Sequence, residues 1–444
     1  MNPPLFLHHA AQLLTLAGSP APRRGRALGR LGLIEGGAVL TQGEQILGVG
    51  ATRELAREAK RLHARPIDCS GRVVMPGFVD SHTHLVFAAS RVEDFALRVS
   101  GKSYQEIAAA GGGIRYSARR LHRASPAELV RQATGFLNEM AAHGATTVEV
   151  KSGYGLDIQS ELKILEAIGE LKKHSPLELV STLLAAHALP PAYQNRPAQF
   201  VDRIIRHLIP EVAHRKLAEF IDCFCERGAF GPQQCRQVLE AGARAGLRPR
   251  IHAEQLSHFG GTRLAIDLGA TSADHLDHVT PAEIHALARS DVAATLVPGA
   301  NFFLGLNRYA PARRLIDAGA VVALATDFNP GTCPCLNMQF ILSLGSLALS
   351  MTPAESIGAA TLNAAYALGR ADRVGSIEPG KQADLAVMDV DDYRKIAYYF
   401  ASNHCVLTVK RGRVIYEKPS AFSDQRSAFS RWRSTNRAPG MPFC

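Results

Sequence analysis

Two histidines, His82 and His84, offer the clearest chemistry in this sequence, because they end an apolar run and stand two residues apart. On a strand, side chains two apart share one face, so both imidazoles would point to the same place. Neutral imidazole is a good ligand for zinc, iron, copper or nickel. A bare pair of this kind is more often solvated or at the edge of a core. A metal site is therefore predicted only if other stretches supply further ligands.

Further residues able to bind a metal or move a proton follow other apolar runs of the chain. In chain order they are Tyr154, His187, Cys225, Glu226, His252, His275 and Asp327. A single histidine after an apolar run usually belongs to the edge of the core. Four runs that end in histidine, with an acid at the end of another, indicate one shared site.

The runs that would position these residues alternate with helical segments. Eight strands are expected at 73–80, 146–150, 179–187, 219–226, 248–252, 271–275, 292–297 and 321–327. Three of the helices start with Ser125, Thr280 or Thr352, each followed by Pro and, three residues after the cap, by Glu. This alternation predicts a parallel (β/α)8 TIM-like barrel, whose active site lies at the carboxyl ends of the strands. A doubly wound open sheet would alternate in the same way and stays open here.

The two ends of the chain have a β-rich texture broken by Gly and Pro. Residues 1–72 and 375–419 are each too short for an independent sandwich, so we expect them to form one composite β-sandwich domain. The barrel domain then covers residues 73–374. The segment 420–444, rich in Ser and Arg, shows no period and is expected to be a loosely ordered tail.

Composition narrows the class of protein. The 444 residues are 46% hydrophobic and 20% charged, as in an ordinary globular protein. The formal charge of +10 comes from scattered Lys and Arg, without nucleic-acid-binding motifs, so we expect a small anionic substrate and no nucleic acid. No run approaches the ~20 apolar residues of a membrane span, so no membrane partner is expected.

The eight cysteines show no secreted pattern, which favours a cytoplasmic location. The pairs Cys223/Cys225 and Cys333/Cys335 lack a second pair at zinc spacing and are expected to be buried thiols.

Several stretches carry a resemblance to a known family: VMPGFVDSHTHLVF, SRVEDFALRVSGKSYQEIAAAGGGI, TTVEVKSGYGL, HAEQLSHFGG and LATDFNPGT. They are similar to signatures of the amidohydrolase superfamily. Within it they resemble the branch that acts on 4-imidazolone-5-propanoate in histidine degradation. The resemblance runs from about Leu5 to Tyr416. It implies hydrolysis of the cyclic amide to N-formimidoyl-L-glutamate, in which metal-activated water attacks the ring carbonyl.

The same resemblance implies one divalent metal ion per subunit, Zn or Fe, held by His82, His84, His252 and Asp327. Three histidines and a carboxylate leave room for a water, as a catalytic metal site requires. A two-metal relative would need a carboxylated lysine on the fourth strand, whose end at 222–227 has none. Lys151, on the second strand, is expected to pair with an acid.

Catalytic roles are expected for His275 and Asp327. His275 would polarise the ring carbonyl and hold the developing oxyanion. Asp327 would pass the proton of the water to the leaving nitrogen. His278, three residues after His275, is expected to be structural.

By resemblance, seven residues line the substrate site: Arg91, Tyr154, His187, Gln255, Asn329, Gly331 and Thr332. Arg91 is the expected partner of the propanoate group, because a guanidinium grips a carboxylate with two parallel hydrogen bonds. A surface role for Arg91, and a simple turn at Gly331 and Thr332, stay open. Some relatives carry Glu at position 255. An amide cannot act as a base, so Gln255 is assigned to hydrogen bonding.

Three other hypotheses remain: a different mononuclear amidohydrolase such as a nucleobase deaminase, an inactive binding protein on this scaffold, and a nucleic-acid-associated protein. Arg91, with the segments around Tyr154 and 329–332, favours a substrate that bears a carboxylate. The glycines at 111–113 follow no strand, so a mobile loop over the site is expected rather than a phosphate loop. A homodimer is expected, because two-fold dimers are the commonest assemblies.

Overall fold

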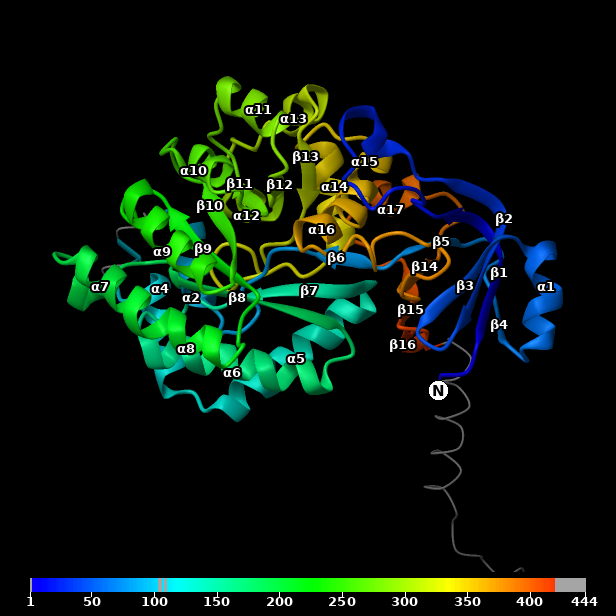
Figure 1. Cartoon of the computed structure of the whole chain (residues 1–444), viewed down its shortest axis with the longest axis horizontal. Helices are drawn as coiled ribbons and strands as arrows, with labels where there is room; N and C mark the ends of the chain where they lie inside the picture. The colour runs from blue at the N-terminus through cyan, green and yellow to red at the C-terminus, as the bar shows by residue number, and fades with distance from the viewer. Residues whose placement is uncertain (1, 103–105, 108–109, 420–444) are drawn as a thin grey trace, which may run out of the picture.

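Eight parallel strands follow one another in chain order around a barrel in the computed structural model, which describes residues 2–102, 106–107 and 110–419 (Figure 1). The strands are β6 (Phe78–Asp80), β7 (Ala145–Lys151), β8 (Glu178–Ala186), β9 (Phe220–Cys225), β10 (Arg248–Ala253), β11 (Ser272–His275), β12 (Ala293–Leu296) and β13 (Val321–Leu324). Just past β6 and β13, Thr83 pairs with Phe328, which brings the first and last strands together. The predicted TIM-like barrel is confirmed, and the open sheet is not found.

Helices wrap the outside of this barrel (Figure 1). They are α2 (Val92–Val99), α4 (Gly113–Arg123), α5 (Pro126–Ala142), α6 (Ile158–His174), α7 (Pro197–Arg203), α8 (Ile209–His214), α9 (Pro232–Arg244), α10 (Gly261–Asp267), α11 (Pro281–Ala288), α12 (Pro298–Leu304), α13 (Ala312–Ala318), α14 (Met338–Leu347), α15 (Pro353–Ala359), α16 (Leu362–Ala367) and α17 (Arg394–Tyr398), with the short turns η1 (Gly25–Gly29), η2 (Pro191–Tyr193) and η3 (Ile204–Leu208).

The predicted helix starts are confirmed. At α5, the Glu128 amide donates to the Ser125 hydroxyl at 3.3 Å, and the Ser125 amide donates back to the Glu128 carboxylate at 2.8 Å. The same reciprocal pair starts α11 at Thr280 and α15 at Thr352. Each of these reciprocal pairs of hydrogen bonds satisfies two amides that the start of the helix would otherwise leave unpaired.

A second, mixed sheet is built from both ends of the chain. Its strands are β1 (Leu5–Leu14), β2 (Leu33–Gln42), β3 (Gln45–Ala51), β4 (Arg65–Asp68), β5 (Val73–Pro76), β14 (Leu385–Met388), β15 (Cys405–Lys410) and β16 (Arg413–Glu417), with α1 (Thr52–Arg61) packed beside them. β5 lies between β1 and β14 and joins the two ends. The sheet has its own apolar cluster, so the predicted composite domain is confirmed as one continuous sheet.

The strand expected at 73–80 proves to be two strands, which is a correction. β5 pairs within the composite sheet, whereas β6 pairs with β7 in the barrel. The chain passes from one sheet to the other at Gly77, whose amide donates to the Asp384 carbonyl at 3.0 Å. A Cβ at Gly77 would lie 2.2 Å from the Thr146 methyl, so only glycine allows this close approach.

Three further expectations concern other parts of the chain. Cys223, Cys225 and Cys333 are buried free thiols, as predicted, and Cys335 is a partly buried one. Among the described residues, no helix has both the length and the apolar character needed to cross a membrane. The expected tail at 420–444 lies outside the described residues.

Candidate metal centre and active site

The metal ligands expected from the sequence meet at the carboxyl-terminal end of the barrel. His82 and His84 follow β6, His252 lies in β10, and Asp327 lies just past β13. The Asp327 carboxylate lies 3.6 Å from Nε2 of both His82 and His84, and Nε2 of His84 lies 3.4 Å from Nε2 of His252. Ligand atoms around one tetrahedral ion with bonds of about 2.0–2.2 Å are separated by about 3.3–3.6 Å. The spacing therefore fits a single ion.

The protonation states of these side chains also suit a cation. Burial lowers the pKa of His82 and His84 well below the ordinary value, so both imidazoles are neutral and keep a free lone pair. Nε2 of His82 is fully buried and has no hydrogen-bond partner in the described part of the chain. Burial raises the pKa of Asp327, and a cation would favour its ionised form instead. The donor set fits Zn or Fe.

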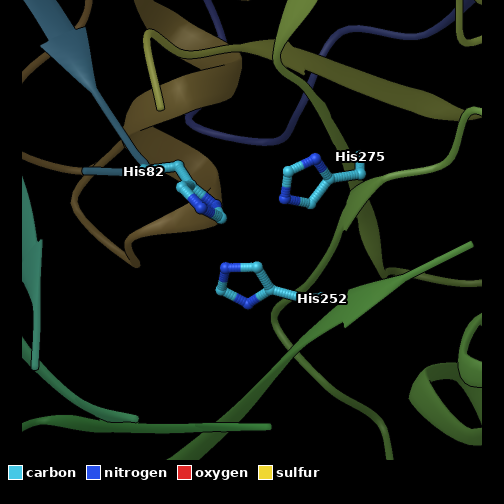
Figure 2. A group of neighbouring side chains, drawn as sticks. All are labelled: His82, His252 and His275. Atoms are coloured by element: carbon cyan, nitrogen blue, oxygen red, sulfur yellow. The ribbon is translucent and has the colours of Figure 1, made fainter. Parts of the chain in front are cut away.

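His275 lies beside the same centre, at the end of β11. Figure 2 shows its ring turned toward His82 and His252, and the ring centroids lie 5.5 and 5.2 Å away. The backbone of His275 has a φ of 80°, a left-handed conformation that non-glycine residues rarely adopt. Burial lowers its pKa well below the ordinary value, so the ring is neutral. The strained turn brings an uncharged imidazole against the metal ligands.

Two carboxylates that the sequence analysis did not single out contact the other faces of the ligands. Asp274 lies with Oδ2 2.7 Å from Nδ1 of His82, and Asp222 lies with Oδ2 3.1 Å from Nδ1 of His252. Both carboxylates are fully buried. The signal in the sequence that could have identified them is an acid inside an otherwise apolar strand. Such an acid indicates a buried partner, since buried charges are rare without one.

Arg91 lies at the start of α2 and is held from two sides. Its Nε donates to Asp94 at 2.6 Å, and the same Asp94 oxygen accepts from the Gly113 amide at 2.9 Å. The guanidinium also lies close to Gly331, where a Cβ would meet Nη1 at 2.1 Å. Since Nε is occupied by Asp94, the two terminal nitrogens are left to bind a carboxylate. The glycine segment expected over the site is thus joined to Arg91 through Asp94.

Tyr154 and His187 form an aromatic wall beside His84. The His187 ring stacks on His84 at 5.1 Å, and the Tyr154 ring lies 5.8 Å from His84. His187 Nδ1 donates to the Gly153 carbonyl at 3.0 Å, and burial lowers the pKa of His187 to about 4. Because the carbonyl can only accept, the proton of this neutral ring lies on Nδ1, and Nε2 is a free acceptor.

The segment after β13 is held by Asn329. The Asn329 side chain donates to the Asp327 carbonyl at 2.7 Å and accepts from the amides of Gly331 at 2.8 Å and Thr332 at 2.7 Å. Its polar atoms are therefore occupied by the turn itself. Of the residues assigned to substrate by resemblance, Asn329 and Thr332 shape this loop.

Gln255 follows β10 and is partly buried, and its side chain makes no hydrogen bond within the described residues. Glu226 holds this loop, because its carboxylate accepts from the amides of Leu256 at 2.8 Å and Ser257 at 3.1 Å. Glu226, one of the strand-end residues expected at the shared site, holds the backbone of this loop. His278, expected to be structural, contributes its amide to the Glu254 carbonyl at 2.9 Å.

The comparisons with known proteins agree with this geometry. Residues 73–415 match the model of the amidohydrolase family, so the chain belongs to that family. Its fold is similar to that of an atrazine chlorohydrolase from Arthrobacter aurescens solved with zinc, with a TM-score of 0.66 and 19% identity over 97% of this chain and 99% of that one. The family consists of metal-dependent hydrolases, and the chain has the residue groups to hold a metal.

Within this family the chain is similar to imidazolonepropionases. The enzyme of Geobacillus kaustophilus is 47% identical over 415 residues, which cover 93% of this chain and 98% of the relative. The enzyme of Chloroflexus aggregans is 44% identical over 420 residues, with the same coverage of 93% and 98%. The resemblance read from the sequence motifs is confirmed over nearly the whole chain.

Proposed function

We propose that this chain hydrolyses the cyclic amide of 4-imidazolone-5-propanoate to N-formimidoyl-L-glutamate in histidine degradation. The observation that carries the proposal is the convergence of a His/Asp metal set with a sequestered guanidinium at one barrel mouth. A nucleobase has no carboxylate for Arg91 to bind, which weighs against the deaminase alternative. The name shared by the relatives supports the same activity.

The proposed centre holds one divalent ion, Zn or Fe, on His82, His84, His252 and Asp327. When bound, such an ion supplies an activated water and a Lewis acid at neutral pH. The same ligands suit both metals.

The remaining side chains bind and orient the substrate. Arg91 would bind the propanoate carboxylate through its two terminal nitrogens, because Asp94 occupies Nε. Burial raises the pKa of Tyr154 above the ordinary value, so its hydroxyl keeps its proton and can donate. His187 offers Nε2 as an acceptor for a ring N–H of the imidazolone. Gln255 is free to donate to the ring as an amide.

Two residues act on the reacting atoms. His275 is a neutral imidazole with one N–H, which would donate to the ring carbonyl oxygen as negative charge develops there. Asp327 would take the proton of the attacking water and deliver it to the nitrogen that leaves the carbonyl. The carbon–nitrogen bond of the ring then breaks and the formimidoyl group stays on the glutamate nitrogen.

A substrate comparison tests the proposal. Freshly made imidazolonepropanoate should lose its ultraviolet absorbance when the protein is added, and N-formimidoyl-L-glutamate should appear in equal amount. Cytosine and guanine, offered under the same conditions, should release no ammonia. Ammonia release from either base, without turnover of imidazolonepropanoate, would overturn the proposal in favour of a deaminase.

We further propose a homodimer in the cytoplasm, without nucleic-acid or membrane partners. Free thiols among the described cysteines support a reducing compartment. The dimer rests on the prevalence of two-fold assemblies. Sedimentation at the mass of a single 47.8 kDa chain would contradict it.

A further inference from the structure

Lys151, at the end of β7, is a fully buried ammonium group for which the proposed reaction has no use. Its Nζ lies 2.8 Å from Glu149 Oε1, 2.8 Å from Asp222 Oδ2 and 3.7 Å from Asp274 Oδ2. Burial alone would lower the pKa of Lys151, but Asp222 and Glu149 raise it above the ordinary value. A buried charge costs several kcal/mol unless it is well paired, and the contacts with these acids offset that cost for Lys151.

Two of the three acids around Lys151, Asp222 and Asp274, also contact the metal ligands. Asp222 Oδ2 touches both Lys151 Nζ and Nδ1 of His252, at 2.8 and 3.1 Å. Asp274 Oδ2 touches Nδ1 of His82 at 2.7 Å and Arg250 Nη2 at 3.2 Å. One lysine therefore lies behind two histidine ligands from two different strands.

These contacts fix the orientation of the imidazoles. A carboxylate can only accept, so Nδ1 of His82, which is hydrogen-bonded to Asp274, carries the proton and the lone pair on Nε2 faces the centre. Asp222 lies 3.1 Å from Nδ1 of His252, and this close charge contact favours the same orientation of that ring. Without Lys151, Asp222 Oδ2 would lose the one ammonium group that contacts it among the described residues. The Cys223 amide, at 2.7 Å from Oδ1, would then be left to hold the carboxylate beside His252. Arg250 would still hold Asp274, since it also donates to the Ser81 carbonyl at 2.8 Å.

We propose that Lys151 is a positioning residue that sets the metal affinity of the site, chiefly by holding Asp222 against the histidine ligand His252. The inference rests on the proposed metal centre and deepens it.

The direction in which cation affinity changes when Lys151 is replaced distinguishes a positioning role from a purely electrostatic one. Replacing Lys151 by a neutral residue makes the region more negative, and electrostatics alone would then strengthen cation binding. Loss of positioning would weaken binding instead, typically 10–100-fold for the partners behind metal ligands. The two effects oppose each other, so the direction of the change in Kd decides between them.

The experiment measures the Kd of Zn²⁺ for the metal-free full chain and its Lys151→Met variant, by competition with a chromophoric chelator. We expect a Kd about 10–100-fold higher in the variant, and a changed visible spectrum of bound Co²⁺. Lys163→Met is the matched control. Lys163 lies on α6, and among the described residues it donates to three backbone carbonyls, the nearest being that of Leu121 at 2.8 Å. Its loss should therefore lower stability and leave the Kd unchanged.

An unchanged or lower Kd in folded Lys151→Met would overturn the inference. If that variant does not fold, Asp222→Asn is measured in the same way, and it should weaken Zn²⁺ binding because His252 loses the carboxylate that orients it. An unchanged Kd in Asp222→Asn would then overturn the inference. No substrate is present, so failure of the wild-type chain to bind Zn²⁺ or Co²⁺ identifies failure of the metal centre itself.

Discussion

Single residues of the site are held in place by partners that lie far away in the sequence. Asp274 contacts His82 across 192 positions, and Gly331 leaves space for Arg91. The ligands could be predicted from the sequence because each follows an apolar run. Asp222 and Asp274 are marked in the sequence only as acids inside apolar strands, and their histidine partners are defined only once the barrel closes.

Arg91→Ala should lower kcat/KM by about 10²-fold, mainly through KM, because the substrate carboxylate would lose a charge-assisted pair. Arg98→Ala is the control on the same helix. Arg98 lies 4.6 Å from the ring of Phe303, and its loss should leave kcat/KM within about twofold. Steady-state kinetics on imidazolonepropanoate measures both. Unchanged kinetics in Arg91→Ala would show that the carboxylate binds elsewhere.

At the scale of elements, strand ends were predicted well, whereas the loops that orient side chains were not. The eight barrel strands lie within a few residues of their expected positions, apart from the break at Gly77. A run of apolar residues indicates a buried segment, and in this chain the buried segments are the barrel strands. The turn between β7 and α6 depends instead on Glu161, whose carboxylate accepts from the amides of Gly153 at 2.8 Å and Gly155 at 2.7 Å.

Glu161 predicts a pH dependence of stability. Burial raises its pKa from the ordinary 4.5 to about 7. Between these values the unfolded chain has lost the proton that the folded chain retains. The stability that this group contributes is therefore complete below pH 4.5 and is lost as the pH rises through about 7, on the order of 3 kcal/mol.

Urea denaturation of wild type and Glu161→Gln across this range measures the effect. The variant has no titrating group at this position, so its free energy of unfolding should fall less with rising pH than that of the wild type. Parallel pH profiles for the two proteins would contradict the assignment.

The junction at Gly77 gives a second prediction for the elements. Gly77→Ala should destabilise the chain by about 1–3 kcal/mol, because the added methyl would overlap Thr146. Gly135→Ala is the control within α5, where a Cβ meets no atom within 4 Å, and it should be neutral or stabilise by up to about 1 kcal/mol. Thermal unfolding compares them. Equal effects would mean that the junction tolerates a side chain.

For the whole molecule, both ends of the chain fold into one sheet beside the barrel (Figure 1). Each end was too short for a domain of its own, and this length argument was enough to predict that they meet. The strand order could not be predicted. β5 pairs with β1 on one side and with β14 on the other, and β14 lies more than 300 residues further along the chain. The barrel mouth is then left free for the metal centre and Arg91.

One metal ion at this mouth is expected to make the chain a hydrolase of imidazolonepropanoate. This is tested by adding Zn²⁺ stepwise to the metal-free protein while the loss of substrate absorbance is followed. The rate should rise in proportion to bound metal and reach its plateau at one ion per chain. Full activity in the metal-free protein, or a plateau reached only at two ions per chain, would rule out a one-metal hydrolase.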